Sequence, residues 1–350
     1  MNLSDFDFDL PSSLIAQEPR PRGASRVLVV RRIAAAWEES TIAALPDLLT
    51  PEDLLVVNDT RVLPARLLGR RDPSGGGAEC LLIERIDETH WHALVHPGQK
   101  LKPGARLIFE DPARAPRVKL RAEVLERRFF GRRLIRFEVE GAPTIDAAIA
   151  ALGHIPLPPY IRRPDTPADR DRYQTIYARV RGSVAAPTAG LHFDEPLLRA
   201  IDARGTRRVS ITHHVGYGTF KPVRSERVED HRVDAESYEI PTSAAEAIDV
   251  TRPRSGRVVA VGTTTTRALE SAAGDDGSIR SGRGLTNLFI YPGYRFRVVG
   301  GLLTNFHLPR SSLLMLVAAF AGRELILDAY QEAIARGFHF YSYGDAMLIL

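Results

Sequence analysis

The chain has 350 residues, of which 44% are hydrophobic and 26% charged, and its formal net charge is +4. This length and apolar content suffice for one large core or two moderate ones and exclude a generally disordered protein. Because Cys80 is the only cysteine, intrachain disulfides, multi-thiolate zinc sites and iron–sulfur clusters are excluded. The longest strongly apolar run, 313–322, is shorter than the roughly 20 residues that a membrane span needs, and residues 1–10 lack the pattern of a signal peptide. We therefore expect a cytoplasmic protein.

Arginine supplies 43 of the 47 basic residues. Its planar guanidinium binds phosphate and stacks on bases, so nucleic acid is a candidate partner, although genomic base composition produces the same bias. The best cluster of cations beside a ring contains Tyr160, Arg162 and Arg163, in the proline-rich segment 156–164. This pattern predicts an extended RNA-binding loop. A solvated connector is the alternative interpretation.

The organisation of the chain changes near residue 62 and again near residue 145. Before the first point, an apolar strand over 54–57 is followed by the polar turn 58–61. Between the two points, turn signals separate short segments of period two, at 65–69, 79–85, 91–96, 106–110, 118–127 and 134–139. Evenly spaced short strands of this kind predict a small β-barrel or sandwich. We expect it to be inserted into an α/β domain formed by the two flanks.

Four junctions outside this insert share one pattern, in which a strand or loop rich in Gly, Thr and His opens a helix. They lie at residues 187–193, 212–220, 258–267 and 304–309. After the first, Asp194 is an N-cap candidate for a helix that ends near Gly205. Junctions of this kind are typical of an α/β domain that binds ligands at the carboxyl ends of its strands.

None of the junctions matches a generic nucleotide motif. Gly216 and Gly218 lack the third glycine of a dinucleotide fingerprint, and the chain has neither a phosphate loop nor a His-Glu-x-x-His helix. His90, His92 and His96 recur with period two among apolar residues, which favours strand faces over a metal site. The sequence thus predicts no metal.

Several long strings resemble one family, the S-adenosylmethionine:tRNA ribosyltransferase-isomerases of queuosine biosynthesis. The resemblance runs from residues 10–17 to the carboxyl terminus, and its most specific strings are residues 58–66, 187–193, 214–220, 261–264 with Arg267, Glu270 and Ser271, 304–309, and 340–347. Such long, collinear and unusual strings make chance similarity remote.

The resemblance implies a reaction in which S-adenosylmethionine donates ribose rather than methyl. The acceptor is 7-aminomethyl-7-deazaguanine at the wobble position of tRNA, and the products are epoxyqueuosine-tRNA, adenine and methionine. The resemblance also implies a monomeric, metal-free, cytoplasmic enzyme. Its expected fold is a large, barrel-like α/β domain, residues 1–61 and 146–350, with a small β-barrel inserted at 62–145.

The chemistry that the resemblance implies requires a base at the 5′ carbon of the ribose, which the positive sulfur acidifies, and an acid for adenine departure. Neutral histidine suits either task near pH 7. The candidates are His192, His214 and His307, with Glu236 and Asp345 as carboxylate alternatives. We expect His192 to act at the chemical step, because it lies in a turn that precedes a capped helix.

Other residues are better suited to holding ligands. Glycine permits close backbone approach and threonine supplies hydroxyls, so the predicted S-adenosylmethionine contacts are Thr188, Gly190, Gly216, Gly218, Gly262, Thr263 and Thr264. Arg267 could pair with the methionine carboxylate or with Glu270, three residues on. The predicted tRNA contacts are Arg61, Tyr160, Arg162, Arg163 and Asn305. Asn305 could instead orient His307.

The chain departs from the family pattern at two places. Val233 and Asp234 stand where Met-His is usual, and Gly300 stands where an Asp is usual. Two other classes of function stay open. An RNA methyltransferase would explain the arginines and ligand loops, yet the usual Gly-rich first turn is missing. A non-catalytic RNA-binding module would explain the insert and the basic loop but not the four junctions.

Overall fold

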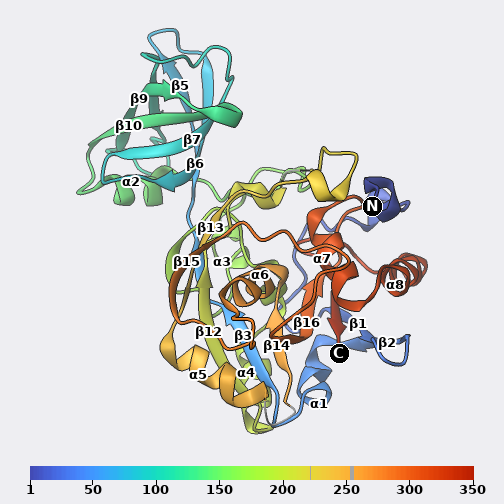
Figure 1. Cartoon of the computed structure of the whole chain (residues 1–350). Helices are drawn as coiled ribbons and strands as arrows, with labels where there is room; N and C mark the ends of the chain where they lie inside the picture. Colours follow the sequence, from blue (N-terminus) through green and yellow to red (C-terminus); the bar gives the residue numbers. More distant parts are fainter. Residues whose placement is uncertain (221, 253–255) are drawn as a thin grey trace.

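The computed structural model describes residues 1–220, 222–252 and 256–350. It shows a small six-stranded barrel beside a larger α/β body (Figure 1). The chain builds part of the larger body, crosses into the barrel, and returns to complete the larger body. The sites described below therefore draw on segments that are far apart in the sequence.

The barrel closes in the order β10-β7-β6-β5-β8-β9. Its strands are β5 (Arg66–Asp72), β6 (Gly77–Arg85), β7 (His90–His96), β8 (Arg106–Glu110), β9 (Lys119–Arg127) and β10 (Arg132–Glu140). Buried and exposed residues alternate along β6 and β9, as period-two segments predict. Helix α2 (Ile145–Leu152), capped by Thr144, packs its apolar side against the barrel, so its buried residues share one core with the strands. The predicted strand positions at 65–139 agree with β5–β10.

The larger body is built on one sheet with the order β15-β13-β12-β3-β14-β16-β17-β1-β2. These strands are β1 (Arg26–Arg31), β2 (Ala36–Thr41), β3 (Leu54–Asn58), β12 (Arg207–His213), β13 (Glu236–Ile240), β14 (Val258–Val261), β15 (Gly282–Thr286), β16 (Val299–Asn305) and β17 (Ala346–Ile349). The sheet is open, with β15 and β2 at its edges in the described part of the chain, and not the barrel-like domain expected above. Both edge strands pair antiparallel with one neighbour, and no pairing that would close the sheet joins them.

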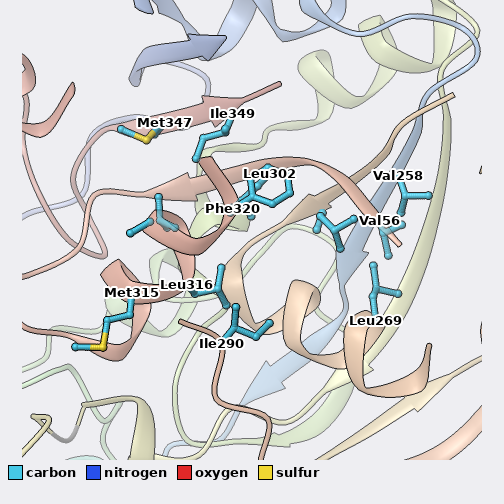
Figure 2. Packing of buried hydrophobic residues seen from close by; sticks show 14 of the residues in the cluster. Val56, Val258, Leu269, Ile290, Leu302, Met315, Leu316, Phe320, Met347 and Ile349 are labelled. Carbon is cyan, nitrogen blue, oxygen red and sulfur yellow. The ribbon is translucent and has the colours of Figure 1, made fainter. Parts of the chain in front are cut away.

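Both faces of this sheet are covered, so its central strands are apolar on both sides. Leu54, Val56 and Leu302 face one core, which α6 (Thr263–Ala272) and α7 (Ser312–Ala321) help to fill (Figure 2). The alternate residues of the same strands face a second core beneath α4 (Glu195–Ala203). Full burial of one such aliphatic side chain stabilises the fold by about 1.5–3 kcal/mol.

Side-chain caps begin α4 and α7, and the sequence predicts the first of them. The Asp194 carboxylate accepts from the Leu197 amide at 2.8 Å at the start of α4, and the Ser311 hydroxyl accepts from the Leu314 amide at the start of α7. The remaining elements are α1 (Leu45–Leu48), α3 (Asp169–Arg172), α5 (Thr242–Thr251), α8 (Arg323–Ala335), β4 (Thr60–Val62), β11 (Val180–Ser183), η1 (Leu3–Phe6), η2 (Ser12–Leu14), η3 (Ile42–Ala44), η4 (Phe129–Gly131), η5 (Thr188–His192), η6 (Tyr217–Phe220) and η7 (Val228–Asp230).

The four junctions meet in two pairs at the carboxyl edge of the parallel strands β12, β3, β14 and β16. The second and third are joined where His213 contacts the Thr264 carbonyl, 2.8 Å from the ring Nδ1. The first and fourth are joined where Asn305 Nδ2 lies 3.1 Å from His192 Nε2. These two pairs form the chemically richest parts of the fold.

Candidate active site

A cavity of about 1410 Å³ lies between the barrel and the large body. The barrel contributes Trp91, Leu94 and Arg132, among others, to its wall. The large body contributes a polar wall that includes Arg61, Arg181, Gly182, His214, Gly216, Gly218, Asp234 and Glu236. The short parallel pair of β4 and β11 carries Arg61 and Arg181 on adjacent strands. Single-ligand pockets measure roughly 300–1,000 Å³, so this cavity has room for more than one small group.

Glu236, at the start of β13, is the centre of a buried polar network in this wall. Its Oε1 accepts from the Gly216 amide at 2.7 Å, and its Oε2 from Arg267 Nη1 at 2.6 Å. His213 Nε2 lies 3.1 Å from the same Oε2. Burial alone would raise the pKa of Glu236, but the hydrogen bond and charge of His213 and the charge of Arg267 lower that pKa to about 2. Glu236 is thus a carboxylate at neutral pH and is a poor base.

His213 is fully buried between two acceptors, the Glu236 carboxylate and the Thr264 carbonyl. The ring can donate to both acceptors only when both of its nitrogens carry hydrogens. The single carboxylate of Glu236 thus contacts both the His213 ring and the Arg267 guanidinium. The remaining Arg267 nitrogen, Nη2, is buried and has no partner in the described structure. Such a nitrogen is costly to leave unpaired, so this network is suited to an additional anion.

A small second cavity adjoins the first at this point. Arg267 lines it together with Thr219, and it shares Gly218, Asp234 and Glu236 with the larger cavity. The first turn of α7, at Ser312, lies on its other side. Helix N-termini attract negative charge, which reinforces the arginine.

His214 follows His213 at the end of β12 and faces the large cavity. Its Nδ1 lies 2.8 Å from the Thr60 hydroxyl. Gly182 packs against the ring: a Cβ at that position would lie 2.6 Å from His214 Cε1, so a larger residue would displace the imidazole. Burial lowers the pKa of His214, and the positive charge of His213 lowers it further. His214 is therefore neutral near pH 7 and can accept a proton.

The structure does not bring the other acid–base candidates to this cavity. His192 is buried, with Ser25 Oγ 2.7 Å from Nδ1 and Asn305 Nδ2 at Nε2, and burial lowers its pKa to about 4. His307 is buried against Thr304, and burial lowers its pKa to about 3. Asp345 accepts from the backbone amides of residues 26 and 339. The expectation that His192 acts in the chemistry gains no support from this geometry.

The predicted ligand-binding glycines divide in the same way. Gly216 and Gly218 line the large cavity, where a Cβ on Gly218 would lie 3.1 Å from Asp234 Oδ2. Gly190 instead packs under the Tyr177 hydroxyl, which a Cβ would approach to 2.3 Å. The cavity linings do not include Thr188, Gly190, Gly262, Thr263 or Thr264. Close packing within the protein therefore explains Gly190 without a ligand.

The predicted tRNA contacts also separate. Arg61 is exposed and lines the cavity. Tyr160 stacks on Tyr341, with ring centroids 3.8 Å apart, and Arg163 pairs with Asp169 at 2.7 Å. Arg162 is exposed, whereas Asn305 is buried, as described above. In the proline-rich loop, only Arg162 of the three keeps its side chain free of such packing.

One local expectation needs correction. Arg267 pairs with Glu236 rather than Glu270. The Glu270 carboxylate accepts from the backbone amides of residues 297–299, which fixes the approach to β16, and from the Tyr294 hydroxyl. These four donors occupy the acceptor sites of the carboxylate, so none is left for the arginine three residues before it.

The departures from the family pattern have different surroundings. Asp234 lines the cavity and pairs with Arg132 at 3.1 Å, which ties the large body to the barrel. Gly300 lies on β16, where its carbonyl accepts from Arg32 Nη2. Only the first departure borders the candidate site.

Sequence reasoning missed His213, Arg132 and Arg181. His213 is the last residue of β12 and His214 follows it directly, so alternation along the strand predicts that the two side chains point to opposite faces. That alternation was a usable signal that only one of them could face a ligand. No signal in the sequence relates Arg132, on the barrel, to Asp234.

Within residues 1–220, 222–252 and 256–350, no group of three or more His, Cys, Asp or Glu side chains is arranged to hold a metal ion. Over the same residues, no helix combines the length and hydropathy that crossing a membrane requires.

Comparisons with known proteins agree on one family. A family model described as "Queuosine biosynthesis protein" matches residues 3–349. Curated proteins named S-adenosylmethionine:tRNA ribosyltransferase-isomerase from Pelotomaculum thermopropionicum and Symbiobacterium thermophilum are 51% and 50% identical to the chain. Each match covers the whole of this chain and the whole of the relative. A crystal structure of S-adenosylmethionine tRNA ribosyltransferase from Thermotoga maritima matches with 37% identity and a TM-score of 0.55, over 99% of this chain and all of the other. The chain therefore belongs to the queuosine biosynthesis protein family and is an enzyme of the S-adenosylmethionine:tRNA ribosyltransferase-isomerase class.

Proposed function

We propose that the chain transfers and isomerises the ribosyl group of S-adenosylmethionine onto 7-aminomethyl-7-deazaguanine at the wobble position of tRNA. The products would be epoxyqueuosine-tRNA, adenine and methionine. The observation that carries this proposal is the pair of adjoining cavities, the larger lined by the neutral His214 and the smaller by the buried, incompletely paired Arg267. The volume of the larger cavity supports binding of a small co-substrate and a nucleobase together.

His214 is the proposed general base at the 5′ carbon of the ribose. In the tautomer in which Nδ1–H donates to the Thr60 hydroxyl, Nε2 carries a lone pair and no hydrogen. The lowered pKa keeps that lone pair available at neutral pH. A positioned base of this kind contributes roughly 100-fold to 10,000-fold to a rate. Among the histidine candidates, His214 is the one that lines the cavity.

Arg267 is the proposed partner of the methionine carboxylate. Its Nη2 is unpaired, whereas its Nη1 and Nε are held by Glu236 and the Leu288 carbonyl. The guanidinium is therefore fixed in place with one nitrogen available. Gly216 and Gly218 leave room for a ligand between Arg267 and His214. Glu236 acts here as an anchor rather than as an acid or base.

The wobble nucleotide would enter from the side of the barrel and of β4 and β11. Arg61 and Arg181 line that part of the cavity and are both exposed, which suits phosphate contacts. The separation of a small-molecule region near Arg267 from an arginine-rich mouth supports two substrates of different size. A monomeric state and a cytoplasmic location remain predictions.

The decisive experiment uses the purified protein, S-adenosylmethionine and tRNA that carries the aminomethyl-deazaguanine. We expect adenine and methionine to be released in equal amounts, and mass spectrometry of the tRNA to show the added, isomerised ribose. Guanine-containing tRNA is the control and should give neither product. Release of S-adenosylhomocysteine would instead indicate methyl transfer and would reject the proposal.

A further inference from the structure

We propose that the hairpin between β9 and β10 forms a docking tip for the anticodon loop of tRNA. The barrel tip is defined here as Arg127, Arg128, Phe129 and Arg132. The inference rests on the proposed function, because it names the surface by which the same site receives its larger substrate. Its chemistry is that of a single-stranded RNA contact, in which a ring stacks on a base and cations contact phosphates.

Phe129 is the most unusual member of the tip. Its side chain is 86% exposed, whereas Phe109 and Phe137 of the barrel are fully buried. An exposed phenyl ring gains nothing from the fold of the barrel. Stacking on an unpaired base would bury one of its faces.

The basic side chains of the tip outnumber the acidic ones that contact it, Glu126 and Asp234. Arg127 and Arg128 are exposed, and no residue of the described chain pairs with the Arg127 guanidinium. Arg128 contacts only Glu126, with both side chains 51% exposed, which makes a weak and readily exchanged ion pair. Segment 127–133 contains four arginines and no acidic residue. This charge complements a phosphate backbone, and the exposed ring beside it favours single-stranded RNA over an acidic protein, which the charge alone would also attract.

The tip is held rigidly although its outer side chains are free. Arg133 is buried and donates to the carbonyls of Leu101 at 3.0 Å and Gly98 at 3.0 Å, as well as to two carbonyls of the hairpin itself. Gly131 makes the turn with a φ of 80°, which a glycine adopts without strain. A preorganised platform of this kind loses little entropy on binding.

The tip is continuous with the candidate active site. Arg132 lines the large cavity and pairs with Asp234 of the large body. A loop whose flanking nucleotides contact Phe129 and its arginines would therefore lie at the cavity mouth, beside Arg132. The barrel tip would thus hold the loop whatever its base sequence, and the adjoining cavity would select the modified base.

The test measures the affinity of the full-length protein for fluorescently labelled tRNA that carries the aminomethyl-deazaguanine. Phe129→Ala should weaken binding roughly 5-fold to 100-fold, the effect expected for loss of one base–aromatic stack. Phe129→Trp, which keeps an aromatic ring at this position, should bind tRNA as tightly as the wild type. The double variant Arg127→Ala/Arg128→Ala should lower the slope of log affinity against log salt by about 1.5. The affinity for S-adenosylmethionine should stay unchanged in every variant.

Matched controls lie on the hairpin between β1 and β2, on the far side of the large body (Figure 1). Ile33 is fully exposed there, and Arg31 forms an exposed pair with Glu38 like that of Arg128 with Glu126. Ile33→Ala and Arg31→Ala should leave tRNA affinity unchanged. Melting temperatures should not move in any of these variants, because the changed side chains are exposed.

The outcomes separate this proposal from the proposed function. If the wild type releases adenine and methionine on tRNA but Phe129→Ala binds tRNA normally, the docking tip is wrong and the function stands. If Phe129→Ala changes the sedimentation of the protein rather than its RNA affinity, the ring is a contact between copies of the chain, and the proposal is overturned. If Phe129→Ala weakens tRNA binding while the wild type shows no ribosyl transfer, the tip is supported and the function fails.

Discussion

Two histidines in this protein have the same kind of partner at Nδ1, a side-chain hydroxyl, but lie in different surroundings. The Nδ1 of His192 lies 2.7 Å from the Ser25 hydroxyl, and the Nδ1 of His214 lies 2.8 Å from the Thr60 hydroxyl. The difference is at Nε2. For His192 this nitrogen meets the Asn305 amide inside the core, whereas His214 lines a large cavity. A histidine bonded at both nitrogens holds segments together, and one bonded at a single nitrogen can exchange a proton.

The same contrast extends to charge. The His214 region contains His213, Glu236 and Arg267, an ionised cluster with one guanidinium nitrogen unpaired. The His192 region contains only neutral partners, and burial keeps both His192 and His307 uncharged. A buried guanidinium nitrogen without a partner is costly to maintain in the absence of an anion. We therefore infer that the first region is built for a ligand and the second for the fold.

The largest expected effect tests the contrast between His214 and His192 directly. His214→Asn should lower the single-turnover rate roughly 100-fold to 10,000-fold, because the variant cannot accept a proton. His192→Asn should turn over at nearly the wild-type rate when folded. Rapid quenching of the reaction, with adenine release as the signal, measures both.

The melting temperature is the control for that pair. His214→Asn should melt within a few degrees of the wild type, since the histidine lies at a cavity wall. If His192→Asn instead loses the larger part of the rate at an unchanged melting temperature, the assignment of roles is reversed.

The next effect concerns the charged cluster. Glu236→Ala leaves His213 and Arg267 buried without their carboxylate, and breaking a buried ion pair in this way costs about 3–5 kcal/mol of unfolding free energy. Urea denaturation measures that loss. Glu239→Ala is the matched control, because this glutamate lies on the same strand and pairs only with the exposed Arg283. A near-neutral Glu236→Ala would show that the cluster is not the buried electrostatic anchor described here.

The sequence predicted the elements of the fold better than the identity of the site. Period-two segments located β5–β10, and Asp194 marked the start of α4, because alternation and capping depend on neighbouring residues only. The contact of Thr60 with His214 joins residues 154 apart in the sequence. No local pattern contains that information.

The choice among histidines failed for the same reason. Three of the four junctions contain a histidine, yet only one presents it to the large cavity. Gly190 and Gly218 show the ambiguity clearly, since one glycine makes room for Tyr177 and the other lines a cavity. A motif shows that space is needed, and the tertiary structure shows what fills it. The family resemblance, in contrast, was confirmed, because it rests on collinear strings along the whole chain.

A pH experiment tests whether His192 and His307 are held uncharged in the folded protein. The pKa of His192 is lowered to about 4 and that of His307 to about 3, against about 6.5 in the unfolded chain. The unfolded state therefore binds more protons below pH 6.5, so stability falls as the pH drops from 6.5 toward the folded-state values. Each histidine should cost about 1.5 kcal/mol at pH 5.5 relative to pH 7.5. Urea denaturation at both pH values measures the change. It should shrink in His307→Gln, and an equal loss in that variant would contradict the assignment.

The smallest effect compares the two hydroxyl partners. Ser25→Ala and Thr60→Val each remove one hydrogen bond to a histidine Nδ1, so each should lower the unfolding free energy by about 1 kcal/mol. Their effects on turnover should differ. Thr60→Val removes the hydrogen bond that fixes the tautomer of His214. It should therefore lower the turnover rate and move the acidic limb of the pH–rate profile, whereas Ser25→Ala should leave both unchanged. Single-turnover rates from pH 5 to 8 provide the readout. Equal profiles for the two variants would mean that Thr60 supports the fold alone and does not orient the proposed base.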